Sequence, residues 1–248
     1  MGIIPARLHS TRLPEKPLQD LCGKPLVVRV LERARLAPSL RDVMVATDSE
    51  RIADVVRAAG GRAEMTSPDH GSGLDRVAEV VSRLDGGPDA DSETPFVNIQ
   101  GDEPFLDPSA LDTLVQLFER PGVRMATLAA PLAAEDVTNP NRVKVVLDRE
   151  ARAIYFSRAP IPFGAGDGGQ APGLLHLGVY AYRRETLLAL ARLPEGPLER
   201  AERLEQLRAL WHGLPIHVAV GNWHAAGIDT PEDLARARTR YQEERGAS

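Results

Sequence analysis

The chain has 248 residues with a formal net charge of −5, and 43% of its residues are hydrophobic and 26% charged. These values are typical of a soluble globular protein and argue against general binding of polyanions such as nucleic acid. The single cysteine, Cys22, excludes an intramolecular disulfide and a zinc site built from cysteines.

No apolar run approaches the length of a membrane-spanning helix, so we expect no transmembrane segment. The first ten residues lack the charged region and apolar run of a secretory signal, and we therefore expect a cytoplasmic protein. The first apolar run, Ile3-Ile4, is short for a strand, which leaves open a natural start further upstream.

The first part of the chain alternates short apolar runs with helical patterns. A helix predicted at Glu50–Ala59 ends at Gly60-Gly61, because glycine adopts the left-handed conformation that often follows a helix. The other predicted segments are strands at Gly2–Pro5, Asp42–Ala46 and Pro95–Ile99 and helices at Pro25–Leu36, Leu74–Leu84 and Pro108–Phe118. This alternation predicts a parallel sheet covered on both faces.

The pattern becomes rich in strands at about residues 125–182, which predicts an excursion that interrupts the α/β body and adds a substrate lid or an oligomer surface. Glycine and proline predict a mobile loop at Pro160–Gly173. The strands predicted in the excursion are Met125–Ala130, Arg142–Leu147, Ala153–Phe156 and Leu175–Tyr182. The α/β pattern then resumes, with helices at Glu185–Leu193, Glu199–Trp211 and Pro231–Glu244 and a strand at His217–Val220.

Three cations follow the first predicted strand, and ligands of open α/β sheets bind beyond the carboxyl ends of strands. Arg7, Arg12 and Lys16 lie among small hydroxyl residues. Two guanidinium forks and one compact ammonium on one loop suit a polyphosphate. The segment is not a Walker loop, because no glycine-rich run precedes Lys16. The alternative is a solvated surface loop.

Two aspartates are candidates for a metal site. Asp102 follows the strand predicted at Pro95–Ile99, beside a glycine that lets a ligand approach, which suits a hard cation with phosphate oxygens. The alternative is an acidic turn. Near the C-terminus, Thr230 and Pro231 have the residue types of a helix N-cap and first turn. Asp229 precedes this cap and is not explained by it, so it is a candidate second carboxylate for magnesium.

Other polar residues leave the choice between structure and function open. The segment Asp69–Arg76 is a loop that opens a helix, and its backbone N–H groups suit an anion. A lone histidine after a strand pattern, such as His176, is usually structural. Glu205-Gln206 on a predicted helix is typical of a solvated face.

Eight segments occur in an order and at spacings that resemble one enzyme family. They are PARLHSTRLPEKPL, DHGSGLDRVAEV, VNIQGDEP, NPNRVKVVLD, YFSRAPIP, HLGVYAYR, LERAERLEQLR and GIDTPEDL. From Gly2 to about Arg238 the chain resembles the 3-deoxy-manno-octulosonate cytidylyltransferases (CMP-Kdo synthetases). The resemblance implies the nucleotide-diphospho-sugar transferase fold, an α/β three-layer sandwich with a mostly parallel central sheet. It also implies one domain over residues 1–248, with the nucleotide-binding part at about 1–120 and a sugar-binding and dimerisation excursion at about 125–182.

The activity implied by the resemblance is cytidylyl transfer from CTP to a 3-deoxy-2-ulosonic acid, giving a CMP-sugar and pyrophosphate for lipopolysaccharide biosynthesis. The implied acceptor is 3-deoxy-D-manno-octulosonate (Kdo), the implied cofactor is Mg²⁺ and the implied assembly is a homodimer, with no nucleic-acid or membrane partner. One alternative is a CMP-sugar synthetase for a different acid, such as an amino-substituted ulosonic or a sialic-type acid. Another is a non-catalytic protein that binds nucleotide sugars.

The resemblance also implies roles for individual residues. Nucleotide binding is implied for Pro5, Ala6, Arg7, Arg12, Lys16, Ser72 and Arg76. Binding of the sugar acid is implied for Gln100, Arg158, His176, Tyr180, Glu205 and Gln206. Asp102 and Asp229 are the implied magnesium ligands, and the implied catalytic residues are Arg7, Lys16, Asp102 and Asp229.

The chain departs from the family pattern at two places. Leu74 stands where the family usually has threonine, which removes a hydroxyl from the segment near the nucleotide. The loop Pro160–Gly173 is short and rich in glycine compared with the usual segment. Both departures bear on which acid is accepted. Lys144, one of only three lysines in the chain, lies in a matched segment and has no assigned mechanism.

Overall fold

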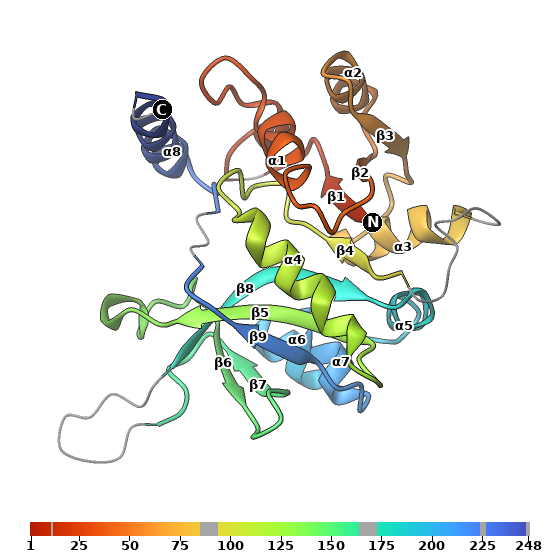
Figure 1. Ribbon diagram of the computed structural model, residues 1–248, viewed down its shortest axis with the longest axis vertical. Coiled ribbons are helices and arrows are strands. Elements are labelled where there is room, and N and C mark those ends of the chain that lie inside the picture. Colours follow the sequence, from red (N-terminus) through yellow and green to blue (C-terminus); the bar gives the residue numbers. More distant parts are fainter. Residues whose placement is uncertain (11, 85–93, 164–172, 224–226, 247–248) are drawn as a thin grey trace. The chain divides into compact units, whose positions relative to one another are not determined.

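The computed structural model describes residues 1–10, 12–84, 94–163, 173–223 and 227–246 (Figure 1). The chain divides into two compact units. The first contains Met1–Asp91, Phe96–Asp112 and His224–Ser248, and the second contains Ser92–Pro95 and Thr113–Trp223. The single domain expected over residues 1–248 stays a prediction.

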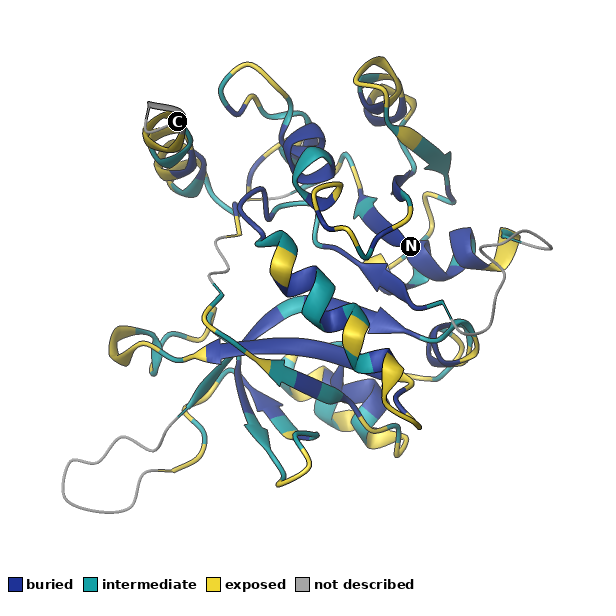
Figure 2. Cartoon of the chain, viewed as in Figure 1, coloured by how far each residue is buried: buried dark blue, intermediate teal, exposed yellow. Residues whose placement is uncertain are grey.

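A parallel sheet forms the centre of the first unit. Its strands are β1 (Gly2–Ala6), β2 (Val43–Thr47), β3 (Arg62–Met65) and β4 (Phe96–Asn98). They lie in the order β3-β2-β1-β4, and each neighbouring pair is parallel. All of β2 and most of β1 are buried, as Figure 2 shows in dark blue, because strands covered on both faces are apolar throughout. The predicted parallel sheet is confirmed.

This unit also contains helices. They are α1 (Leu26–Ala34), α2 (Glu50–Ala58), α3 (Gly73–Arg83) and α8 (Pro231–Gly246). A further helix, α4 (Pro108–Gln116), begins in the first unit and ends in the second. The first three bury most of their apolar residues, together with Arg29 of α1 and Arg76 of α3, and leave their other charged residues at least partly exposed, which is the amphipathic pattern of helices on a sheet.

The second unit is rich in strands, as predicted for the excursion. Its strands are β5 (Met125–Pro131), β6 (Lys144–Leu147), β7 (Ala153–Ser157), β8 (Leu174–Tyr182) and β9 (His217–Val220). Strand β5 pairs with β8 antiparallel and with β9 parallel, while β6 pairs antiparallel with β7 and β8. Its short helices are α5 (Arg184–Leu190), α6 (Pro197–Glu202) and α7 (Leu207–Trp211).

The structure corrects two features of the predicted element order. Strand β3 was not predicted, because its four residues include no apolar run and none is fully buried. The single helix predicted at Glu199–Trp211 is wrong, since α6 and α7 are separated by Arg203 in a left-handed conformation with φ 54°. The guanidinium of Arg158 donates to the carbonyls of Glu202 (2.8 Å) and Arg203 (3.3 Å), so the end of α6 is held from outside the helix.

Two further predictions concern segments rather than elements. Most of the loop predicted at Pro160–Gly173 falls on residues 164–172, which lie outside the described residues. Over the part of the chain that the structure describes, no helix combines the length and the apolar character needed to cross a membrane.

Gly61 closes the turn between α2 and β3, and the space around it predicts a stability effect. A Cβ atom there would lie 2.6 Å from Leu31 and 2.7 Å from the side chain of Val56. We expect Gly61→Ala to lower the free energy of unfolding by roughly 1–3 kcal/mol, measured by urea denaturation, because the core is overpacked. The control is Gly227→Ala, since no atom lies within 4 Å of its added methyl group. Equal stability of the two variants would contradict this account.

Candidate functional site

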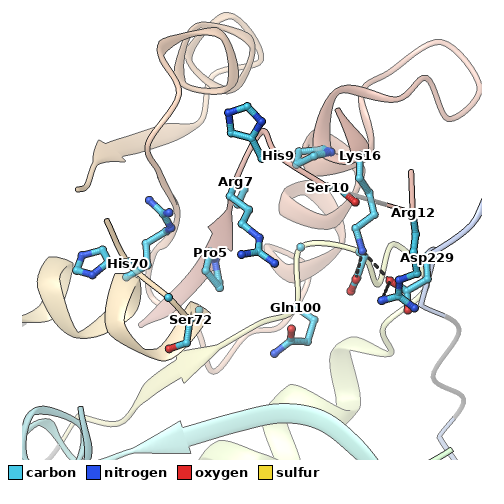
Figure 3. Close-up of a pocket in the computed structure, with 17 residues that line it drawn as sticks. Pro5, Arg7, His9, Ser10, Arg12, Lys16, His70, Ser72, Gln100 and Asp229 are labelled. Atoms are coloured by element: carbon cyan, nitrogen blue, oxygen red, sulfur yellow. Dashed lines mark hydrogen bonds and ion pairs between the residues drawn. The ribbon is translucent and has the colours of Figure 1, made fainter. Parts of the chain in front are cut away.

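A cavity of about 700 Å³ lies in the first unit where β1, β4 and the start of α3 come together (Figure 3). Its volume is in the range of small-molecule sites. Its lining comes from three chain segments and Asp229, namely Pro5, Ala6, Arg7, His9, Ser10, Arg12, Lys16, Pro17, His70, Gly71, Ser72, Gly73, Arg76, Gln100, Gly101, Asp102 and Asp229. The structure therefore brings together the predicted phosphate-binding loop, both predicted metal ligands and the helix-opening segment.

Close approach of two strand ends forms the floor of the cavity. A Cβ atom at Gly101 would lie 2.9 Å from the carbonyl oxygen of Pro5, so only glycine fits against the end of β1 without a shift of the backbone. This is the carboxyl edge of the parallel sheet, where ligands of open α/β sheets bind.

Lys16 lies between the two aspartates. Its Nζ is 2.5 Å from Oδ2 of Asp102 and 3.0 Å from Oδ1 of Asp229, and Arg12 also donates to Oδ1 of Asp229 at 3.0 Å. Burial alone would lower the pKa of Lys16, but its ion pairs and hydrogen bonds with the two carboxylates raise the pKa. Lys16 is therefore a protonated, partly buried cation that both carboxylates share.

Backbone hydrogen bonds hold these carboxylates side by side. The N–H of Ile228 donates to the carbonyl of Asp102 at 2.9 Å and joins the segment before α8 to the end of β4. The carboxylate of Asp233 accepts the N–H groups of Asp229 (3.0 Å) and Thr230 (2.9 Å). The hydroxyl of Thr230 accepts the N–H of Asp233 at 3.2 Å, which confirms the predicted N-cap.

The carboxylate pair has the chemistry of a magnesium site. Oxygen atoms of Asp102 and Asp229 converge on one position, which the ammonium of Lys16 holds as a stand-in cation. No group of three or more acidic, histidine or cysteine side chains suited to a metal occurs among the described residues. Two carboxylates completed by substrate phosphates and water are a usual arrangement for Mg²⁺.

Side-chain hydrogen bonds hold the opposite wall. The hydroxyl of Ser72 caps α3 by accepting the N–H of Asp75 at 3.2 Å. Arg76 is buried, and its guanidinium donates to Asp48 (2.9 Å), to the hydroxyl of Thr66 and to the carbonyl of Ser67 (3.3 Å). The geometry thus makes Arg76 a brace of the cavity wall.

Arg7 differs from the other cations of the cavity. In Figure 3 its side chain extends into the cavity, and within the described part of the chain it makes no hydrogen bond or ion pair. Its guanidinium is therefore available to an anion without first breaking an ion pair.

The residues predicted to bind the sugar acid are divided between the units. Gln100 lines the cavity of the first unit, whereas the other five belong to the second. Within the second unit the ring centroids of His176 and Tyr180 lie 5.3 Å apart. The pKa of Tyr180 is raised mainly by burial, and the negative charge of Glu205 adds to this effect. Gln206 is buried and Arg158 is partly buried.

Comparison with known proteins decides the family. A family model described as cytidylyltransferase matches residues 1–216. The chain belongs to the cytidylyltransferase family. Proteins named 3-deoxy-manno-octulosonate cytidylyltransferase from Solibacter usitatus and an Anaeromyxobacter species are 47% and 50% identical to it. These alignments cover 98% and 95% of this chain, respectively, and 94% of each relative.

Solved structures agree with this membership. A CMP:2-keto-3-deoxy-manno-octonic acid synthetase in complex with CTP has a TM-score of 0.91 and 40% identity, with 98% of both chains covered. A 4-diphosphocytidyl-2C-methyl-D-erythritol synthase from Anaerococcus prevotii shares the fold, with a TM-score of 0.65 at 13% identity and 97% of both chains covered. The predicted family, nucleotidyltransferase class and fold of this cytidylyltransferase are confirmed.

Sequence reasoning missed two features of the cytidylyltransferase cavity. His70 lines it and lies 2.5 Å from the carboxylate of Glu79; both residues belong to the matched segment DHGSGLDRVAEV, but no role was assigned to either. Leu74, the departure from the family pattern, is buried in the core of α3 and is not among the lining residues. The lost hydroxyl therefore lies outside the cavity surface.

His176 is neutral because it is buried. Burial lowers its pKa from 6.5 to about 3. Its Nε2 lies 3.1 Å from the hydroxyl of Thr127, and that hydroxyl has a nearer acceptor in the carbonyl of Val179 at 2.7 Å. Since the hydroxyl has one hydrogen, Nε2 carries the imidazole proton and donates to Thr127.

This burial predicts a pH-dependent stability. In the unfolded chain His176 takes up a proton near pH 6.5, whereas in the folded chain it does so only near pH 3. Its contribution to stability is therefore present above pH 6.5 and is lost as the pH falls toward 3. As the pH falls, the free energy of unfolding of the wild type should decrease relative to that of His176→Gln by up to about 1.4 kcal/mol per pH unit. Urea denaturation between pH 7 and 4.5 measures the difference.

The matched control is His212→Gln, which removes an exposed histidine of the same unit. It should keep the wild-type pH profile. Parallel profiles for the wild type and His176→Gln would show that His176 is not held neutral.

Proposed function

We propose that this chain transfers the cytidylyl group of CTP to Kdo and releases pyrophosphate. The observation that carries the proposal is the shared position of Lys16 between Asp102 and Asp229, in a cavity that also presents Arg7 and Arg12. Family membership and the names of the relatives that cover nearly the whole chain support CTP and Kdo as the substrates.

The reaction joins the two substrates without a protein nucleophile. The oxygen of the anomeric hydroxyl of Kdo forms a bond to the α-phosphorus, and the bond from that phosphorus to the bridging oxygen breaks. Pyrophosphate leaves with the bonding electrons, and the hydroxyl proton passes to solvent. Negative charge grows on the α-phosphate oxygens and on the leaving group, so catalysis depends on cations and on positioning.

The phosphate-binding loop supplies these cations. Arg7 is available at once, while Arg12 and Lys16 are released when their shared carboxylates gain another partner. Lys16 then stabilises the leaving pyrophosphate as a compact charge close to oxygen, which a planar guanidinium does not reproduce. Backbone groups of Pro5 and Ala6 and the cap residue Ser72 complete the nucleotide site.

Asp102 and Asp229 are the residues that would hold Mg²⁺. When bound, the ion would lower the pKa of the acceptor hydroxyl and stabilise charge on the α-phosphate. The two carboxylates fit this ion because their oxygens already share one cation, and a metal held there would take the place of the Lys16 ammonium. Lys16 would then be available to the phosphates.

The second unit supplies the groups for the sugar acid. Arg158 keeps its positive charge for the carboxylate of the acid, since in the described chain its guanidinium bonds to carbonyl oxygens and forms no ion pair. The groups proposed to contact the sugar hydroxyls are the neutral imidazole of His176 and the side chains of Tyr180, Glu205 and Gln206. A homodimer and a cytoplasmic location complete the proposal as expectations from the family resemblance.

The test is pyrophosphate release from CTP and Mg²⁺ with a panel of acids: Kdo, an amino-substituted ulosonic acid and a sialic acid. The wild type should turn over fastest with Kdo. Asp102→Asn should reduce turnover by roughly 10³-fold, because a metal ligand worth several kcal/mol in the transition state is lost. Circular dichroism should be unchanged.

The matched control is Asp54→Asn, at a side chain that is 74% exposed on α2 and outside the cavity. It should retain wild-type turnover. If Asp102→Asn releases pyrophosphate at nearly the wild-type rate, the metal assignment is overturned. If the wild type turns over another acid faster than Kdo, that acid is the acceptor instead.

The position of Lys16 predicts a second measurement, one that needs no turnover. Lys16→Met removes the cation that competes for Asp102 and Asp229, so Mn²⁺ should bind roughly tenfold more tightly to the nucleotide-free variant than to the wild type. Titration calorimetry, or electron paramagnetic resonance of free Mn²⁺, measures this affinity.

Lys24→Met is the control, because Lys24 pairs with Glu32 at 2.5 Å and does not line the cavity. It should bind Mn²⁺ as the wild type does. If Lys16→Met binds the ion no more tightly than Lys24→Met, then Lys16 does not hold the metal position.

A further inference from the structure

Lys144, at the start of β6 in the second unit, is completely buried. Its Nζ donates to the carbonyls of Asn139 (3.0 Å), Arg142 (2.6 Å) and Arg158 (2.6 Å). An ammonium has three hydrogens, so these bonds use all of its donors and leave none for a ligand. Burial lowers the pKa of Lys144, but three carbonyl acceptors bind Nζ, and only the protonated form has three hydrogens to donate to them.

A second cation interlocks with the first. The guanidinium of Arg158 donates to the carbonyls of Pro140 (2.9 Å), Glu202 (2.8 Å) and Arg203 (3.3 Å). Pro140 lies between two of the residues whose carbonyls bind Lys144, and Lys144 in turn binds the carbonyl of Arg158. The two side chains therefore join three segments, 139–142, 157–158 and 202–203, through carbonyl oxygens alone.

The side chains of Lys144 and Arg158 and the segments 139–142, 157–158 and 202–203 that they join form a frame. One carboxylate closes this frame. Glu202 accepts the backbone N–H of Arg158 at 2.9 Å and the hydroxyl of Ser157 at 2.6 Å. The charge of this carboxylate favours the protonated form of Lys144, so one anion accompanies the two cations. A buried charge is costly, and an apolar side chain of similar volume usually serves packing as well or better. Packing alone therefore gives a poor account of an ammonium at residue 144.

The frame adjoins the residues proposed for the sugar acid. Lys144 is paired with Leu175 across β6 and β8, and the N–H of His176 donates to the carbonyl of Val143 at 2.8 Å. On the other side, Arg203 precedes Glu205-Gln206 by two residues, in the break between α6 and α7. Movement of the frame would displace His176, Arg158 and the Glu205-Gln206 turn together.

We propose that Lys144 is a positioning residue for the sugar acid. Its ammonium fixes the backbone of Arg158 and of residues 139–142 before the acid binds. The inference rests on the proposed function, because it takes Kdo as the ligand of Arg158 and its neighbours. Lys144 touches no substrate. Its charge, added to that of Arg158, also makes the frame electropositive and so suited to a carboxylate.

The experiment compares Michaelis constants for the two substrates in Lys144→Met, which keeps the length of the side chain and removes the ammonium. The KM for Kdo should rise roughly 10- to 100-fold, because misplaced binding groups lose that much. The KM for CTP should stay within about twofold, since Arg7, Arg12 and Lys16 belong to the first unit. Arg158→Met should raise the KM for Kdo similarly, and the double variant should be no worse than either single one.

A stability-matched control separates positioning from a general loss of packing. Val145→Ala creates a cavity next to Lys144 in the same strand, where Val145 is 1% exposed, but leaves the carbonyl bonds in place. It should lower the melting temperature with both Michaelis constants unchanged. If Lys144→Met does not fold, Lys144→Gln, which retains donors, should show a smaller rise in the KM for Kdo alone.

Each outcome decides the matter. The inference is supported if Lys144→Met raises the KM for Kdo and leaves the KM for CTP unchanged. The double variant with Arg158→Met should then show no further rise in the KM for Kdo. Equal changes in both constants, or behaviour like that of Val145→Ala, overturn the inference while leaving the proposed function intact. A wild type that turns over no acid overturns both.

Discussion

The hydrogen bond from Ile228 to the carbonyl of Asp102 is the contact on which the cavity depends. It joins the segment before α8 to the end of β4 and so places Asp229 beside Asp102, although the two are far apart in the sequence. Gly101 allows the same turn to lie against the carbonyl of Pro5. Without these two backbone contacts the carboxylates would not converge, and Lys16 would have no shared partner. The chemistry of the cavity thus follows from main-chain geometry at the carboxyl edge of a parallel sheet.

The three lysines show why an ammonium is not interchangeable with a guanidinium in this arginine-rich chain. Lys24 is exposed and pairs with Glu32, an arrangement that an arginine would also make. The ammonium of Lys16 lies between two carboxylates, at a position that suits a compact cation. The larger, planar guanidinium of an arginine would extend beyond this position. Lys144 directs three hydrogens to three carbonyls in a site with no exposed surface. Two of the three lysines therefore occupy places where a small, tetrahedral donor is required by the geometry.

Much of the fold was accessible from the sequence because apolar runs mark strands buried on both faces, as in β2, and because the loop after β1 concentrates charge. Features set by contacts distant in the sequence were not accessible. Strand β3 has no apolar run, and the break between α6 and α7 arises because Arg158 holds the carbonyls of Glu202 and Arg203. The bracing of Arg76 by Asp48 likewise depends on β2 and α3 meeting. The family resemblance named residues for the site, but only coordinates distinguish a side chain that faces the cavity, such as Arg7, from one that supports its wall.

The charges in the cavity constrain the order in which ligands are accommodated. Without ligands, Arg12 and Lys16 offset Asp102 and Asp229, Asp48 offsets Arg76, and Arg7 is the one cation lining the described cavity with no ion pair. A triphosphate brought into this arrangement would gain Arg7 but would lie close to two carboxylates, and their repulsion would oppose it. A divalent ion alone would have to displace Lys16 with no phosphate to receive that lysine. Under the proposed function both costs would be smaller if metal and nucleotide bound together, since a metal would offset the carboxylates and the phosphates would bind Arg12 and Lys16. If the chain binds both ligands as proposed, this interdependence is a coupling free energy between them, and by linkage each would strengthen the binding of the other by the same factor.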